Sequence, residues 1–492
     1  MGGPPLYYIS VMQRVVNYIL SHFPHHPTAM QASACEEMVR FLFDPDPASA
    51  FLLRGYAGTG KTTLVSALVR SAPALHIKTL LLAPTGRAAK VLASYSGQPA
   101  YTIHRKIYQT VTDSTGAMHM ARAFNKHTYT LFIVDEASMI GQGTDFGADS
   151  HNLLEDLVDY VGEGSHCRLM LIGDTAQLPP VGSDQSPALD LGYLAEVLRL
   201  NMHHCELTEV VRQQQLSGIL LNATLLRRQI ALLEPDGTPD MPLFDLEGCT
   251  DVVRLQGGEL EEILNREYDH HGIEQMVIVT RSNKRANLFN QEIRNRILFR
   301  EEEVNAGDHL MVVKNNYYWL EPESGIGFIA NGDIAEVQSL RNHQELYGFH
   351  FADATLRFVD YPDLPAHDCK LLLETLHSES PSLTAAESQQ LFEAVMEDYA
   401  DMPRKQDRLR AVKQNPYYNA LQVKFSYALT CHKTQGGQWG TVVIDQGYLT
   451  DEMVDREYLR WLYTAVTRAT GRVYLLNFKD NFFQPPDNNF GK

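Results

Sequence analysis

A glycine-rich stretch near the start of the chain has the spacing of a loop that holds phosphates. Residues 55–63 read GYAGTGKTT, which matches GxxxxGK[ST] and lies between an apolar run and a helical pattern. In such a loop, backbone N–H groups hold the phosphates, the lysine places its charge on them, and the following hydroxyl binds Mg²⁺. The residues expected to hold a nucleotide here are Gly55, Gly58, Thr59, Gly60, Lys61, Thr62 and Thr63.

An acidic pair ends an apolar run seventy-four residues after Lys61, in the stretch LFIVDEAS. Asp135 would hold Mg²⁺ together with Thr62, and Glu136 would orient and deprotonate the attacking water. A third polar position, Gln177, follows the next apolar run in LIGDTAQLPPVG, where an amide can bond the γ-phosphate or its water. Because a kinase or transferase needs only the first two parts, simple phosphotransfer leaves the third unexplained.

Short apolar runs bounded by turn residues must position these side chains. Four such runs lie at residues 50–55, 79–84, 130–136 and 168–174, and three more lie at 275–280, 441–446 and 472–478. Flanked by helical patterns, they are typical of buried strands in parallel sheets. We therefore expect an α/β fold with two cores.

The second core is interrupted by a large insertion over residues 331–424. Its first part, at 333–340 and 354–361, has strand-like patterns, whereas residues 383–413 form a charged helical pattern. A further helical pattern at 216–233 lies between the two cores. We assign no chemistry to either helical segment.

Composition excludes several classes of protein. The chain has 492 residues, and its 42 basic and 60 acidic residues give a formal net charge of −18. The overall charge therefore does not indicate a nucleic-acid or membrane partner. Any nucleic-acid contact must come from a local groove. The six cysteines are scattered, which is typical of reduced thiols in a cytoplasmic protein. No apolar run reaches the roughly 18 residues that a membrane span needs.

Further motifs complete an ordered series. The stretches GYAGTGKT, APTGRAAKVL, TIHRKIY, VDEASM, GDTAQLPPV, LTEVVRQ, YALTCHKTQGGQW and YTAVTRA follow one another along the chain. This series resembles that of superfamily 1 helicases, and the branch that it resembles is the RecD-like and Dda-like branch, superfamily 1B. The resemblance extends over residues 31–478.

The resemblance implies two RecA-like P-loop NTPase cores, each a parallel sheet flanked by helices, with a small SH3-like β insertion in the second core. The expected boundaries are an N-terminal helical extension at 1–26, the first core at 27–205, the second core at 206–330 and 425–492, and the insertion with its helical elaboration at 331–424. A candidate pin hairpin occupies 108–129 and turns at 113–116, with a plain surface loop as the alternative.

The resemblance also implies the residues of two sites. ATP would lie between the cores, where Arg468 resembles an arginine finger, Arg212 a second γ-phosphate contact and Gln31 an adenine-reading glutamine. Gln438 departs from the family pattern, in which many members have glutamate, so we assign it no role. The residues implied to contact single-stranded DNA are Pro84, Thr85, Arg87, Thr102, His104, His432, Lys433, Thr434 and Gln435.

Together these features imply an ATP-dependent DNA helicase or translocase that moves 5′ to 3′ on single-stranded DNA, a polarity that rests on the resemblance alone. RNA as the track stays open. The alternatives are a DNA-stimulated ATPase subunit of a recombination or repair complex, and a P-loop phosphotransferase. The expected partners are single-stranded DNA, junctions between single-stranded and duplex DNA, and repair or recombination proteins. We expect a cytoplasmic monomer that contacts no membrane.

Overall fold

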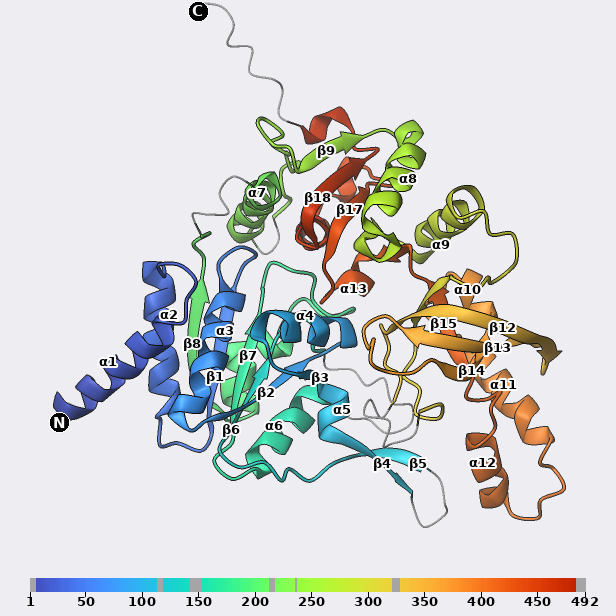
Figure 1. The fold of residues 1–492 in the computed structure, drawn as a ribbon, viewed down its shortest axis with the longest axis horizontal. Coiled ribbons are helices and arrows are strands. Elements are labelled where there is room, and N and C mark those ends of the chain that lie inside the picture. Colours follow the sequence, from blue (N-terminus) through green and yellow to red (C-terminus); the bar gives the residue numbers. More distant parts are fainter. Residues whose placement is uncertain are drawn as a thin grey trace, which may run out of the picture.

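The computed structural model describes residues 6–112, 118–141, 152–211, 217–234, 237–320 and 328–483. Its first core is a parallel six-stranded sheet with the order β3-β2-β6-β7-β1-β8 (Figure 1). The strands are β1 (Ser49–Gly55), β2 (Lys78–Ala83), β3 (Ala100–Thr102), β6 (Thr130–Val134), β7 (Arg168–Gly173) and β8 (Asn201–Leu207). The helices beside them are α2 (Ala29–Leu42), α3 (Lys61–Ser71), α4 (Gly86–Ser96) and α6 (Leu153–Glu163).

Both faces of this sheet are buried, because side chains alternate along each strand and helices cover both sides. Phe51 and Leu53 pack in one cluster with residues of α2 and α3, whereas Leu52 packs on the other face with residues of α6. Helix α1 (Leu6–Leu20) adds Val16 and Ile19 to the first cluster. This packing holds in place the carboxyl ends of β1, β6 and β7, which the predicted nucleotide-binding residues follow.

The second core is a parallel five-stranded sheet with the order β16-β10-β17-β18-β9. Its strands are β9 (Val252–Leu255), β10 (Met276–Thr280), β16 (Ala428–Thr430), β17 (Trp439–Asp445) and β18 (Ala469–Leu476). Its helices are α7 (Gly218–Leu232), α8 (Leu260–His271), α9 (Asn283–Glu292), α13 (Cys431–Thr434) and α14 (Arg456–Val466). All seven buried strands expected from the sequence are present, and the helical pattern at 216–233 forms α7.

The insertion forms a closed five-stranded barrel beside the second core (Figure 1). Its strands are β11 (His309–Val312), β12 (Ile334–Leu346), β13 (Phe349–Phe358), β14 (His367–Leu372) and β15 (Leu421–Phe425). The barrel starts earlier than the predicted insertion, since β11 pairs with both β12 and β15 and thereby closes it. Three helices lie between β14 and β15, namely α10 (Glu374–His377), α11 (Ala385–Glu397) and α12 (Lys405–Lys413).

A two-stranded hairpin projects from the first core after helix α5 (Ile103–Ile107). Strands β4 (Tyr108–Thr112) and β5 (Met118–Arg122) pair in antiparallel register. The turn predicted at 113–116 lies outside the described residues. Arg122, at the end of β5, pairs with Glu163 of α6 at 2.8 Å, so the base of the hairpin is tied to the first core.

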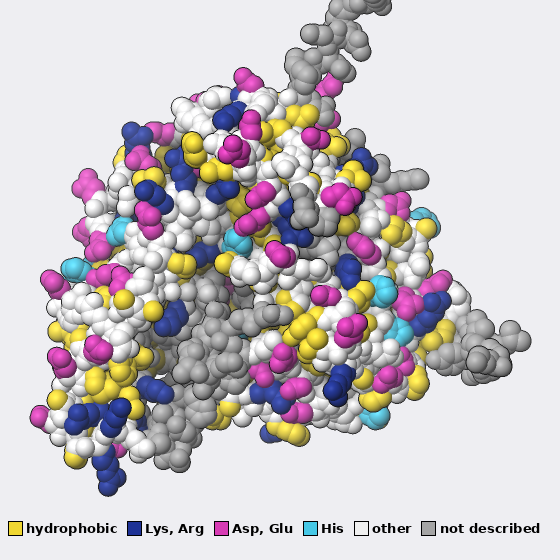
Figure 2. All heavy atoms as spheres, turned by 180° about the vertical axis from the view of Figure 1, so that it is seen from behind, with side chains coloured by type: hydrophobic (Ala, Val, Ile, Leu, Met, Phe, Trp, Pro, Cys, Tyr) yellow, Lys and Arg dark blue, Asp and Glu magenta, His cyan; other side chains and the backbone are white. Residues whose placement is uncertain are grey.

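The described surface has no single sign of charge on the face that Figure 2 shows. Figure 2 shows basic and acidic side chains intermingled over the described part of the back face. Among the described residues, no helix is long and apolar enough to cross a membrane.

Candidate functional site

The phosphate loop connects β1 to α3 and turns through two glycines in the left-handed region. Gly58 has φ +74° and Gly60 has φ +86°, which glycine adopts without steric cost. Lys61 opens α3, and its Nζ donates hydrogen bonds to the carbonyl oxygens of Gly55 at 2.7 Å and Tyr56 at 3.0 Å. The ammonium group is therefore held over the loop, at the helix N-terminus where anions bind.

The acidic pair follows β6 directly. Glu136 has φ +53°, a left-handed conformation that strains a residue other than glycine, and such strain is concentrated at functional sites. Its N–H donates to Asp135 Oδ1 at 2.8 Å, and the Tyr95 hydroxyl donates to Asp135 Oδ2. Desolvation and the neighbouring Glu136 raise the pKa of Asp135 above its ordinary value.

A third group of polar side chains comes from the segment after β7. Gln177 is buried, and its Oε1 has no hydrogen-bond partner among the described residues. Asp174, in the same GDTAQ stretch, is also buried, and it accepts a hydrogen bond of 2.6 Å from the hydroxyl of Tyr463. Burial raises the pKa of Asp174, while Lys61 opposes the rise. We did not single out Asp174 in the sequence, although its motif was recognised.

The second core faces the acidic pair with an arginine. Arg468, only 3% exposed, directs Nη1 to within 3.6 Å of Glu136 Oε1. The guanidinium also donates to the carbonyl oxygens of Thr464 at 3.3 Å and Gly437 at 3.4 Å, which hold it in the cleft. Arg212, the second arginine implied by the resemblance, lies outside the described residues.

These groups line one cavity of about 570 Å³ between the two cores. Of the predicted nucleotide-site residues, it is lined by Gly58, Gly60, Lys61, Thr62, Thr63, Asp135, Glu136, Gln177 and Arg468. Gln438, to which the sequence assigned no role, lines it as well. The hydroxyl of Thr62 and the carboxylate of Asp135 supply the hard oxygen ligands that Mg²⁺ prefers, so the donor set fits this ion.

Two predicted nucleotide-binding side chains have other partners. The amide of Gln31 donates to the Thr59 carbonyl oxygen at 3.0 Å and accepts from the Thr28 N–H at 3.0 Å, closing a capping box at the start of α2. The Thr59 hydroxyl donates to the Tyr56 carbonyl oxygen at 2.8 Å. Both side chains are buried and support the loop from behind, and neither lines the cavity.

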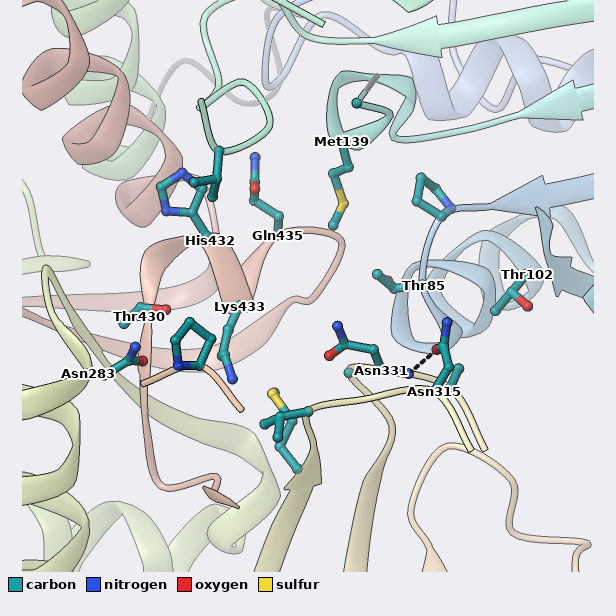
Figure 3. Close-up of a pocket in the computed structure, with 18 of the residues that line it drawn as sticks. Thr85, Thr102, Met139, Asn283, Asn315, Asn331, Thr430, His432, Lys433 and Gln435 are labelled. Carbon is teal, nitrogen blue, oxygen red and sulfur yellow. Dashed lines mark hydrogen bonds between the residues drawn. The ribbon is translucent and has the colours of Figure 1, made fainter. Parts of the chain in front are cut away.

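A second, larger cavity forms a groove of about 740 Å³ across both cores and the barrel. Figure 3 shows Thr85 and Thr102 on one side, His432, Lys433 and Gln435 on the other, with their side chains around a common space. The predicted strand-contact residues that line it are Pro84, Thr85, Thr102, His104, His432, Lys433 and Gln435. The sequence separates these two groups by more than 300 residues, and the fold brings them together.

Arg87 and Thr434 do not line the groove. The Arg87 guanidinium lies over the Trp439 ring, 3.8 Å from its centroid, and Nη2 donates to the Gln438 carbonyl oxygen at 3.3 Å. Arg87 therefore joins the two cores rather than facing the groove. Thr434 is fully buried and its hydroxyl donates to the Cys431 carbonyl oxygen at 2.7 Å, which stabilises the short helix α13.

Several groove residues were not predicted. Met139, Asn283, Asn315 and Asn331 project into the same space in Figure 3, and Arg281 and Lys284 also line it. Asn315 Oδ1 accepts a hydrogen bond of 2.7 Å from the Asn331 N–H, which connects two edges of the barrel mouth. Met139 stands in VDEASM and Asn331 opens the predicted insertion, whereas the other residues belong to no motif that we recognised.

Burial sets the charge of the groove. It lowers the pKa of His104 to about 4 and the pKa of His432 below its ordinary value, so both imidazoles are neutral near neutral pH. Burial and the nearby Lys424 lower the pKa of Lys433 to about 8. Lys433 Nζ has no hydrogen-bond partner within the described part of the chain, which leaves this ammonium group available to an anion.

The groove and the nucleotide cavity share a connection. Gln435 lines the groove, and its Nε2 donates to the Leu178 carbonyl oxygen at 2.7 Å. The Leu178 N–H donates to the Thr464 hydroxyl at 2.9 Å. Leu178 is the neighbour of Gln177, so the segment that carries this amide is held by two side chains of the second core.

This arrangement defines the class of protein: a two-core P-loop NTPase with a nucleotide cavity between its cores and a polar groove across them. Two family models match the sequence. The AAA domain model matches residues 28–230, and the UvrD-like helicase C-terminal domain model matches residues 425–476. The first match lies in the first core and the start of the second, and the second match begins where the barrel ends.

One known helicase resembles the chain over most of its length, and a second resembles about a third of it. The ATP-dependent RecD2 DNA helicase of Deinococcus radiodurans is 26% identical over 426 residues, covering 86% of this chain and 46% of that protein. The ATP-dependent DNA helicase dda of Enterobacteria phage T4 is 29% identical over 164 residues, covering 32% of this chain and 34% of that protein. The chain thus spans about half the length of the first relative.

A crystal structure of Pif1 helicase from Bacteroides, in complex with ADP-AlF3 and single-stranded DNA, aligns with 93% of this chain and 94% of its own, with 15% identity and a TM-score of 0.44. The resemblance rests on the similarity in sequence. The family models and the two relatives confirm the resemblance to superfamily 1B helicases that the motifs indicated.

Proposed function

We propose that this chain is an ATP-dependent DNA helicase that hydrolyses ATP between its two cores and moves along single-stranded DNA held in the groove. The observation that carries the proposal is the position of Arg468 opposite Glu136, at 3.6 Å across the cleft. Because hydrolysis would need both cores, the distance between them would change with the state of the nucleotide. The groove spans the same two cores, so the same movement would act on a bound strand.

In this proposal the chain's own residues divide the work at the nucleotide. Lys61 and the loop glycines bind the phosphates, Glu136 takes a proton from the attacking water, and Arg468 neutralises charge on the transferring phosphoryl group. Thr62 and Asp135 would hold Mg²⁺, which shields the phosphate charge when bound. Gln177, which lines the same cavity, would hydrogen-bond the γ-phosphate or its attacking water. Arg212 is proposed as a second phosphate contact.

The groove suits a nucleic-acid strand of any sequence. Hydroxyls and amides dominate its polar lining, and cations are few, as expected for contacts that follow a backbone without reading bases. Single-stranded DNA is the proposed track, with 5′ to 3′ movement carried over from the superfamily 1B resemblance. The hairpin of β4 and β5 is proposed as the pin that meets the junction with duplex DNA.

The remaining parts of the proposal rest on the expectations from the sequence rather than on geometry. We propose that the chain works in the cytoplasm as a monomer and meets repair or recombination proteins. The phosphotransferase alternative is not favoured, because it gives no role to Arg468 or to the groove across both cores.

Steady-state ATP hydrolysis by the purified chain tests the proposal. The rate would be measured without nucleic acid, with single-stranded DNA and with RNA of equal length, alongside a Lys61→Ala control. We expect strong stimulation by DNA that the control lacks. A rate indifferent to both strands would contradict the motor, and 3′ to 5′ displacement of end-blocked strands would overturn the polarity.

A further inference from the structure

One turn of chain joins the nucleotide cavity to the groove. The 3-10 turn η2 (Ala137–Met139) starts directly after Glu136. Glu136 lines the nucleotide cavity, whereas Met139, three residues further on, lines the groove. Figure 3 shows the Met139 side chain pointing into the groove between Thr85 and Gln435. A residue of the hydrolytic pair and a residue of the groove are therefore separated by a single turn.

Hydrogen bonds make this turn a stiff unit. The Met139 N–H donates to the Glu136 carbonyl oxygen at 3.0 Å, and the Ile140 N–H donates to that of Ala137 at 3.1 Å. The Ser186 Oγ lies 2.9 Å from the Ala137 carbonyl oxygen and 2.8 Å from that of Ile140, so its one hydrogen is shared between these two acceptors. These bonds fix the internal geometry of the turn, so a displacement of Glu136 would carry Met139 with it.

Close packing beneath the turn limits its freedom further. A Cβ atom at Gly173 would lie 3.2 Å from the Ser138 nitrogen and 2.6 Å from Leu189 Cδ2. The turn therefore rests directly on the end of β7, where only glycine leaves enough room. Glu136, directly before the turn, is in the left-handed conformation with φ +53°, and the two ends of this segment face different cavities.

The second core acts on this turn through Arg468. Its Nη1 lies 3.6 Å from Glu136 Oε1, so the turn already has an ionic contact across the cleft. A γ-phosphate in the cavity competes with Glu136 for this guanidinium, because phosphate accepts two parallel N–H bonds from arginine. Binding of nucleotide therefore changes the force on Glu136 without any contact to the groove.

We propose that Met139 is a positioning residue that couples the nucleotide cavity to the grip on the strand. Its flexible, polarisable thioether packs against bases or sugars in the groove, a contact that suits any sequence. Nucleotide shifts the turn through Glu136, and the turn moves Met139 toward or away from the strand. The proposal rests on the proposed function, since it needs a nucleic-acid strand in the groove.

The test uses the reciprocity of linked binding. The full-length chain would be titrated with fluorescent single-stranded DNA, without and with a non-hydrolysable ATP analogue, and with the fluorescent analogue, without and with DNA. In the wild-type chain each ligand must change the affinity of the other by the same factor, commonly about 5- to 150-fold for coupled sites. We expect Met139→Ala to bring this factor close to one in both titrations, and Met139→Leu to retain most of it.

A matched control separates coupling from simple contact. Asn283→Ala alters a partly buried groove residue at the start of α9 in the second core, away from the acidic pair, so it should weaken DNA binding and leave the coupling factor unchanged. The Met139 side chain is only partly buried, and equal midpoints of thermal unfolding would show that both variants are folded.

The outcomes are distinct. A wild-type coupling factor in Met139→Ala, or equal loss of coupling in Asn283→Ala, would overturn the role of Met139 while leaving the motor intact. A wild-type chain that binds no DNA in any nucleotide state would instead contradict the proposed function. Loss of the factor in Met139→Ala alone, with intact nucleotide affinity in the absence of DNA, supports the proposal.

Discussion

The hydroxyl of Tyr463 in the second core donates a hydrogen bond of 2.6 Å to Asp174 in the first core. The same hydroxyl accepts a bond of 2.9 Å from the Ala57 N–H of the phosphate loop. Tyr463 is almost fully buried, so no water is at hand to replace it. One side chain therefore ties the second core both to the loop that holds phosphates and to the segment that carries Gln177.

Tyr463→Phe should loosen this connection while preserving the ring. The change leaves the Asp174 carboxylate and the Ala57 N–H without their partner, and a buried polar group left unpaired costs about 1–3 kcal/mol. We expect a lower midpoint of thermal unfolding and a higher KM for ATP. Tyr448→Phe, in a ring that is 80% exposed, is the matched control and should change neither quantity. Wild-type values in Tyr463→Phe would show that the hydrogen bonds of the Tyr463 hydroxyl contribute neither to stability nor to ATP binding.

Arg468→Ala should abolish most of the ATP hydrolysis. Removing an arginine that neutralises the transferring phosphoryl group typically lowers kcat by about 10³- to 10⁵-fold, while ATP binding persists. Arg468→Lys should recover little, because an ammonium group lacks the planar fork of guanidinium. The control is Arg472→Ala, a partly exposed arginine that pairs with Glu267 outside the cavity. A kcat within a few-fold of wild type would remove Arg468 from the reaction.

Binding of single-stranded DNA should weaken as pH rises through the pKa of Lys433. A lysine is charged below its pKa and neutral above it, and burial lowers the pKa of Lys433 to about 8. At constant ionic strength, the affinity measured by fluorescence anisotropy should fall between about pH 7 and pH 9, by up to about tenfold per pH unit at the steep end.

Two variants isolate this titration. Lys433→Arg keeps its charge over the whole range, because the guanidinium pKa lies far higher, so its affinity should vary little with pH. Lys433→Met should bind weakly at every pH. A wild-type pH dependence in Lys433→Arg would assign the effect to another group.

The imidazole of His203 should stabilise the first core in a pH-dependent way. Its Nδ1 lies 2.8 Å from Glu37 Oε1 and its Nε2 lies 2.7 Å from Asp44 Oδ2, so both nitrogens donate when the ring is charged. Burial opposes this charge, but the bonds to Asp44 and Glu37 outweigh it and raise the pKa of His203. The bond from His203 likewise lowers the pKa of Asp44 to about 2.

The two pKa shifts determine how the stability of the first core depends on pH. Because the pKa of His203 is raised on folding, its stabilisation is complete below the unfolded value of about 6.5 and is lost as pH rises through the folded value. The contribution of Asp44 is present above about pH 4 and is lost toward pH 2. The difference in thermal midpoint between wild type and His203→Gln should be largest near about pH 5 and shrink as pH rises through the raised pKa of His203. A constant difference would contradict this account.

Local sequence patterns were enough to predict the strands and helices, and to predict many of the residues that line the nucleotide cavity. The phosphate loop is one contiguous stretch, and its glycines, Lys61 and Thr62 need only the end of β1 and the start of α3 to take up their positions. The buried strands could be predicted because each is a short apolar run. The acidic pair and Gln177 follow such runs directly, and parallel strands bring their carboxyl ends to one edge of a sheet.

The sequence alone predicted less well the positions of side chains whose partners lie far away along the chain. The amide of Gln31 reaches back to the loop carbonyl of Thr59, and the guanidinium of Arg87 lies over Trp439, more than 300 residues away. In both cases the residue type permits several partners, and neighbouring residues do not choose among them. The early start of the barrel has the same origin, since β11 belongs to it only by pairing with β12 and β15.

The order and spacing of the motifs therefore determine that this chain folds into two α/β cores, because each motif needs only its own strand and turn. The contacts that join the cores depend on the tertiary structure: Tyr463 on Asp174, Arg468 beside Glu136, and Met139 in the groove one turn from Glu136. Such contacts arise from how two sheets and a barrel pack, and the energy of that packing is summed over many residues that no short motif contains.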